Sequence, residues 1–130
     1  MNLLSMKQAV EGQIRIELLD DPFLAAMCPE KQNSSSKVKH PYIAIVAQPG
    51  REYEVGSGIF TTPVEIEVHT KKDVSPEDVD TIVARIAVQL TAAQQRADYG
   101  LLFNGEQPTQ FVSDTIRKRV FQVTVISAVA

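Results

Sequence analysis

The spacing of hydrophobic and polar residues changes sharply between residues 61 and 90. Val64, Ile66 and Val68 alternate with polar residues, which is the period of two expected for a β-strand with one buried face. After a charged turn, apolar residues recur at spacings of three and four: Val79, Ile82, Val83, Ile86, Ala87 and Leu90. This second pattern predicts a helix with one buried stripe. Together, the two patterns predict a helix packed on a sheet.

The start of this helix is also encoded locally. Ser75 is a suitable N-cap and Pro76 suits the first helical position. Glu77 and Asp78 would lie in the first turn, where carboxylates favour the positive end of the helix dipole. The pattern predicts a helix over residues 75–90, and the following residues tolerate an extension to Arg96.

The N-terminal segment predicts a second helix, over residues 5 to about 19. Its apolar residues recur every fourth position: Met6, Val10, Ile14 and Leu18. Asp21 can then act as a cap, and Pro22 can open a short helical turn.

Three segments are predicted to be strands. Residues 42–47 are apolar with little alternation, which favours a central strand covered on both faces. Residues 59–70 form the second strand, in which Pro63 indicates an edge position or a bulge, because proline cannot donate to the ladder. Residues 117–129 form the last strand, and residues 101–112 are interpreted as irregular chain with one short strand at most.

The predicted fold class is α+β, a single small domain over residues 1–130. We expect a mixed or antiparallel sheet of three to five strands with two main helices packed on one face. The polar segment at about residues 30–40 is predicted to be a mobile loop, and residues 51–57 a long hairpin tip or a small flap.

Bulk properties exclude several classes of function. The 13 basic and 16 acidic residues give a formal net charge of -3, so we do not expect nucleic-acid binding through an overall field. No apolar run approaches the roughly 18 residues of a membrane span, and a membrane role is not expected. Cys28 is the single cysteine, which excludes an intrachain disulfide, and the first ten residues do not resemble a signal peptide.

No pattern indicates catalysis, a cofactor or a metal. Cys28, His40 and His69 fit no metal-ligand spacing, and His69 is expected to be solvated. Glu65 and Glu67 share a strand face, but outward acids on such a strand usually serve solvation rather than acid–base chemistry. We therefore expect a protein that is not an enzyme.

Arg117, Lys118 and Arg119 form the densest basic cluster. On a strand these side chains alternate between faces, so they would not form one phosphate-binding row. Charges that discourage pairing at a strand end are the simpler interpretation. Contact with an acidic partner or nucleic acid, together with Lys37 and Lys39, is the alternative.

The chain resembles the tail-terminator proteins of long-tailed bacteriophages and prophages, which act in tail completion and head–tail joining. The resemblance covers most of the chain and rests on the predicted helix at residues 75–90 and on four further segments: Leu18-Leu19-Asp20-Asp21-Pro22, His40-Pro41-Tyr42-Ile43, residues 64–69 and residues 119–125. It implies a compact α/β subunit that closes into a ring, commonly a hexamer, on the tail tube. It also implies tail-tube and head-connector proteins as partners, and a location in the virion and, during assembly, in the host cytoplasm.

Strand edges predict how such a ring would form. The last strand is long and apolar, and as an exposed edge it would invite pairing with a neighbouring subunit. We expect the contacts to include Arg51, Glu52, Tyr53, Glu54, Lys37, Lys39, Arg117, Lys118 and Arg119. The alternative function is a small binding or regulatory module that recognises a peptide or nucleic acid, and an enzyme with an unrecognised site comes third.

Overall fold

The computed structural model describes residues 3–28, 40–96 and 99–128. Its helices are α1 (Leu3–Leu19), the short α2 (Pro22–Ala25) and α3 (Pro76–Arg96). Its strands are β1 (Tyr42–Ala47), β2 (Arg51–Glu52), β3 (Ile59–Lys71), β4 (Gly100–Glu106), β5 (Gln110–Phe111) and β6 (Ile116–Ala128). The predicted loop lies almost entirely outside the described residues, as do Lys37 and Lys39. Of the helices described, none is long and apolar enough to cross a membrane.

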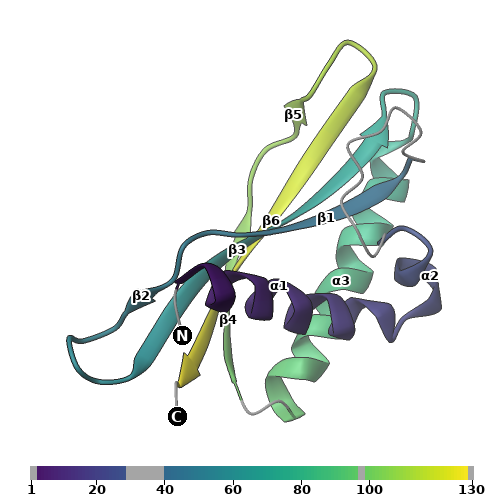
Figure 1. The fold of residues 1–130 in the computed structure, drawn as a ribbon. Helices are drawn as coiled ribbons and strands as arrows, with labels where there is room; N and C mark the ends of the chain where they lie inside the picture. Colours follow the sequence, from purple (N-terminus) through teal and green to yellow (C-terminus); the bar gives the residue numbers. More distant parts are fainter. Residues whose placement is uncertain (1–2, 29–39, 97–98, 129–130) are drawn as a thin grey trace.

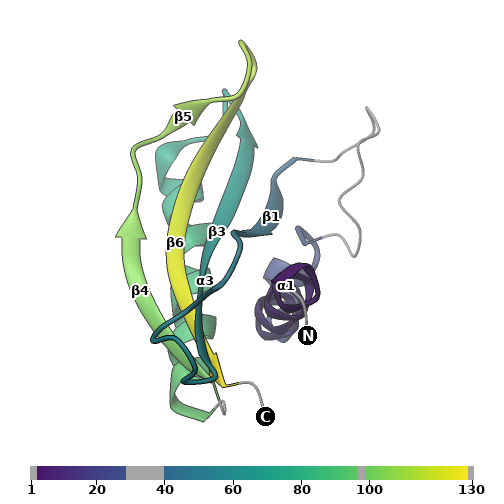
Figure 2. The ribbon, with the colours of Figure 1, turned by 60° about the vertical axis from the view of Figure 1, so that its left-hand side comes forward.

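All strand pairs in the described sheet are antiparallel. The main strands follow the order β1-β3-β6-β4, while β2 pairs with β3 and β5 pairs with β6 (Figure 2). β3 and β6 pair along their whole length, from Ile59 opposite Ala128 to Lys71 opposite Ile116. The α+β class predicted from the sequence is confirmed: four main strands form the sheet, and two short strands extend it.

Both long helices pack on the same face of the sheet. Their buried residues form one core with the inward residues of β1, β3, β6 and the first part of β4. The stripe predicted on α3 supplies most of its buried side chains, and Ile86 and Leu90 are fully buried. Of the stripe predicted on α1, Val10, Ile14 and Leu18 are buried in this core, and the side chain of Met6 lies outside the described part of the structure.

Local capping fixes the helix starts. The Ser75 hydroxyl accepts a hydrogen bond from the backbone N–H of Asp78 at 3.2 Å, and α3 begins at Pro76. The Asp21 carboxylate accepts from the backbone N–H of Phe23 at 2.9 Å, and Pro22 opens α2. Both caps predicted from the sequence are confirmed.

The edges of the sheet differ from those predicted. β6 is an interior strand, because β3 lies on one side of it and β4 and β5 lie on the other. β1, predicted to be central, is at the end of the strand order, and the backbone N–H of Ile43 donates to the Met27 carbonyl at 2.7 Å. The segment predicted to be irregular contains β4, a seven-residue strand.

Pro63 lies in an interior strand without a bulge, which corrects the prediction that β3 would be bulged or at an edge. The Pro63 carbonyl accepts from the backbone N–H of Gln48 at 2.8 Å, so the side of Pro63 that lacks a donor also faces Gln48. Regular pairing between β1 and β3 stops just before it reaches Pro63, at the pair Ala47 opposite Val64. The proline is tolerated because it lies beside the gap between β1 and β2.

Candidate functional site

The paired strands β3 and β6 form a ribbon whose two ends project beyond the helices in opposite directions (Figure 1). The paired length of the strands corresponds to about 40 Å. One end carries the hairpin tip, defined as residues 51–58, which comprises β2 and the turn that leads into β3. The other end carries the β5–β6 hairpin and the turn that leads from β3 to α3. The two ends of the ribbon are therefore formed by different segments of the chain.

The hairpin tip is held by hydrogen bonds of its own. The Glu52 carboxylate accepts from the backbone N–H groups of Gly56 at 3.2 Å and Gly58 at 3.1 Å. Both glycines have positive φ, 84° and 71°, which other residues rarely adopt. The Tyr53 N–H donates to the Ile59 carbonyl at 2.8 Å. The tip is therefore a shaped turn, and it confirms the hairpin tip predicted here.

This ordered turn presents apolar side chains to solvent. Tyr53 is 70% exposed and Val55 is 101% exposed. Glu54 and Arg51 are exposed beside them. Four of the predicted interface residues, Arg51 through Glu54, thus lie together at this end of the ribbon.

A cavity of about 550 Å³ lies at the opposite end of the ribbon. We call it the basic hollow, and it is lined by Lys71, Lys72, Asp73, Thr115, Ile116 and Arg117. Its two sides are joined by a hydrogen bond from the Lys72 N–H to the Thr115 carbonyl at 2.8 Å. Within the part of the chain that the structure describes, none of the three cations in this lining forms an ion pair. With three cations and one carboxylate in its lining, the hollow therefore carries an excess of positive charge.

The predicted basic cluster diverges at this end, as expected from strand alternation. Lys118 lies 3.6 Å from a Glu67 carboxylate oxygen, on the face away from the helices. Arg119 pairs with Asp80 of α3 and lies 3.8 Å from a carboxylate oxygen of Glu106. The Arg117 guanidinium lies 5.5 Å from the ring centroid of Phe111. Of the three residues, only Arg117 lines the hollow, and it forms no ion pair with a described residue.

The sequence interpretation missed the outer edge, formed by β4 and β5. No described strand pairs with the outer side of either strand. We include in the outer edge Val112, the residue that follows β5, and its exposed apolar residues are Leu102, Phe103, Phe111 and Val112. The run Leu101-Leu102-Phe103 before Asn104-Gly105 was the available signal. The run does not alternate, since only Leu101 is buried and the rest of β4 is exposed, and β4 is bulged directly after it, between Phe103 and Gly105.

A polar cluster lies on the open face of the sheet, away from the helices. The His69 Nε2 lies 3.0 Å from the Glu67 carboxylate, and both side chains are 13% exposed, which corrects the expectation that His69 is solvated. The Tyr42 ring stacks on His69 with centroids 4.8 Å apart. The hydrogen bond from His69 and the charge of Lys118 hold the pKa of Glu67 below its usual value. Glu67 is thus held as a paired carboxylate rather than poised as a proton donor.

The described residues contain no cluster of three or more His, Cys, Asp or Glu side chains suited to a metal ion. Burial raises the pKa of the Cys28 thiol, and a protonated, buried thiol is a poor nucleophile. The surroundings of Cys28 therefore do not favour nucleophilic chemistry.

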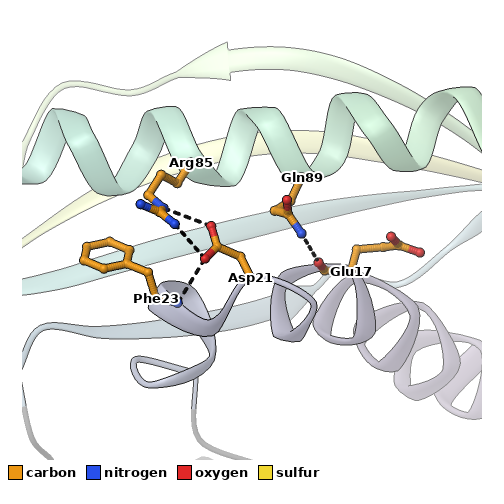
Figure 3. A network of polar contacts seen from close by, with 5 residues as sticks. All are labelled: Glu17, Asp21, Phe23, Arg85 and Gln89. Carbon is orange, nitrogen blue, oxygen red and sulfur yellow. Dashed lines mark hydrogen bonds and ion pairs between the residues drawn. The ribbon is translucent and has the colours of Figure 1, made fainter.

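A second polar network joins the helices rather than forming a site (Figure 3). Both carboxylate oxygens of Asp21 accept from Arg85 of α3 at 2.9 Å, and the Arg85 guanidinium lies 4.5 Å from the centroid of the Phe23 ring. The Gln89 amide donates to the Glu17 carbonyl at 3.0 Å. We call the Asp21–Arg85 pair the helix clamp. Sequence reasoning missed it because its members are 64 residues apart.

In comparisons with known proteins, no family model matches the chain, and no curated protein matches it at a significant level.

Proposed function

We propose that this protein is a non-enzymatic structural subunit that assembles with copies of itself. In this proposal it acts as a phage or prophage tail terminator: it caps the tail tube as a ring and takes part in tail completion and head–tail joining. Its partners would be tail-tube and head-connector proteins, and its location would be the virion and, during assembly, the host cytoplasm.

The outer edge is the observation that carries the proposal. An unpaired strand normally carries charges, prolines or a covering segment that prevent edge-to-edge pairing. In β4, Leu102 and Phe103 are exposed at 52% and 38%, and the only charged residue of the strand is the terminal Glu106. A backbone edge flanked by exposed apolar side chains suits an interface between subunits.

The shape of the subunit supports a ring rather than a two-fold dimer. The hairpin tip and the outer edge differ in sequence and structure and come from different parts of the chain. A contact between two unlike surfaces leaves one of each free, so subunits add in the same sense, and they form a ring where the rotation between neighbours closes. The hexamer number comes from the resemblance alone.

A small binding module is the second candidate, and the same edge favours it. An extended peptide can add a strand to an exposed sheet edge through main-chain hydrogen bonds. The two candidates differ in the partner that covers β4, which is a second copy in one and a foreign peptide in the other.

The experiment adds the purified protein to the polymerising tail-tube protein of the same phage or prophage. We expect ring-shaped particles and shorter, capped tubes by electron microscopy. Replacing Leu102 and Val112 with lysine should abolish rings and capping, since it places charge on the outer edge. Val88→Lys is the matched control, because Val88 is 65% exposed on α3. A protein that remains monomeric at high concentration and leaves tube length unchanged would refute the proposal and favour the binding module.

A further inference from the structure

The hairpin tip and the basic hollow match each other but cannot meet within one chain. They lie at opposite ends of the β3–β6 ribbon, separated by about 40 Å of strand (Figure 1). Each end is also tied internally, the tip by Glu52 and the hollow by the Lys72–Thr115 hydrogen bond. A contact between these surfaces therefore requires two copies.

The two surfaces are complementary in charge. The tip carries two carboxylates, Glu52 and Glu54, and one cation, Arg51. The lining of the hollow has the opposite excess of charge, with three cations and the single carboxylate of Asp73. The cations of the hollow have no ion-pair partners among the described residues, so an incoming carboxylate would compensate existing charge rather than compete for it.

The two surfaces also match in their apolar parts. The cavity, at about 550 Å³, is in the size range of pockets that accept small organic groups, so it has room for the Tyr53 side chain. Ile116 in its lining and the neighbouring Phe111 ring, over which Arg117 lies, supply apolar surface. Tyr53 and Val55 are exposed on a turn that is already shaped, so little conformational entropy would be lost on docking.

We propose that the hairpin tip of one copy docks in the basic hollow of the next. Tyr53 and Val55 enter the hollow, and Glu54 faces Lys71 and Lys72. The inference rests on the self-assembly proposed above and specifies which parts of two neighbouring copies meet. The hollow lies beside β5, so this contact continues into the outer edge and makes the interface head-to-tail.

Cysteine cross-linking tests this contact directly. Val55→Cys and Thr115→Cys each introduce one exposed thiol, while the native Cys28 is buried and remains unreactive. Mixing the two variants under mild oxidation should give a disulfide-linked dimer at least several-fold above the level obtained with Val55→Cys and Thr91→Cys. Thr91 is exposed on α3, away from both surfaces. A yield equal to that control would overturn the inference.

A charge swap gives an independent measurement. Glu54→Lys and Lys72→Glu should each weaken association about tenfold in sedimentation equilibrium, and the double variant should regain most of the loss. All three variants change exposed residues and should keep the melting temperature of the parent. Single variants that associate like the parent would overturn the inference.

The results separate this inference from the proposed function. Rings that form and cap tubes without the cross-link or the charge dependence would reject the tip-in-hollow contact and leave the outer edge as the interface. A chain that neither self-associates nor caps tubes would reject both. If Lys72→Glu changed only the retention of nucleic acid, the hollow would be a phosphate-binding surface and the inference would be wrong.

Discussion

The two faces of the sheet use the same strands in different ways. On the face covered by α1 and α3, the side chains of Ile45, Ile66 and Val123 are at most 2% exposed and contact other apolar groups. On the open face, the Glu67 carboxylate forms a hydrogen bond with His69 and an ion pair with Lys118. The difference shows that the first face depends on apolar contacts that exclude water, and the second on polar contacts within β3 and between β3 and β6.

The largest effect is expected where the covered face meets α3. Ile86→Asp places an unpaired carboxylate at a fully buried position, which should lower the free energy of unfolding by more than about 4 kcal/mol. Val88→Asp, on the exposed side of the same helix, should stay within about 0.5 kcal/mol of the parent. Urea denaturation followed by circular dichroism measures both. Equal stability of the two variants would contradict the packing of α3 on the sheet.

The helix clamp should show the next largest effect, with a defined pH dependence. Asp21→Asn keeps an N-cap but removes the charge that pairs with Arg85. The Arg85 guanidinium holds the pKa of Asp21 below its ordinary value of 3.8. The pair therefore stabilises the fold above about pH 3.8, and this contribution is lost as the pH falls through the lower, folded-state pKa.

Parent and Asp21→Asn should consequently differ in melting temperature at pH 7 and converge in strong acid. Asp20→Asn, at the exposed neighbouring position, is the matched control and should match the parent at both pH values. A difference that persists unchanged at low pH would mean that the clamp is not electrostatic.

The open face should respond more weakly. Glu67→Gln removes the charge shared with His69 and Lys118 and should lower stability by about 0.5–1 kcal/mol at pH 7. The pKa of Glu67 is lowered in the folded state, so this difference should disappear as the pH falls through that value. Glu65→Gln changes the neighbouring acid on the same face and is the control. A larger loss for Glu65→Gln would contradict the pairing described for Glu67.

The smallest effect is expected at the hairpin tip. Glu52→Gln leaves one acceptor oxygen for two backbone donors, so the tip should loosen while global stability changes by only a few tenths of a kcal/mol. Hydrogen exchange at the Gly56 and Gly58 amides should become faster, and Glu54→Gln should leave it unchanged. Unchanged exchange in Glu52→Gln would show that its carboxylate does not hold the tip.

The sequence alone determined the features that depend on near neighbours along the chain. The alternation in β3 and the stripe of α3 identify which side chains are buried, because each pattern repeats with the period of its own element. Ser75, Pro76, Asp21 and Pro22 fix the helix starts, since a cap acts within three residues. The divergence of Arg117, Lys118 and Arg119 also follows from the strand period.

Only the tertiary structure decided which strands lie at the edges. Side-chain alternation reports the two faces of a strand. An edge is instead defined by backbone N–H and C=O groups that have no partner strand, and every residue except proline carries the same two groups. The sequence pattern therefore predicts an edge position for β6, which is wrong, and it does not identify β4, an exposed and bulged strand that pairs with β6. Local sequence patterns do not specify pairing between distant segments. The tertiary structure therefore also decides that the hairpin tip and Arg117 lie at opposite ends of the ribbon, and that Asp21 meets Arg85.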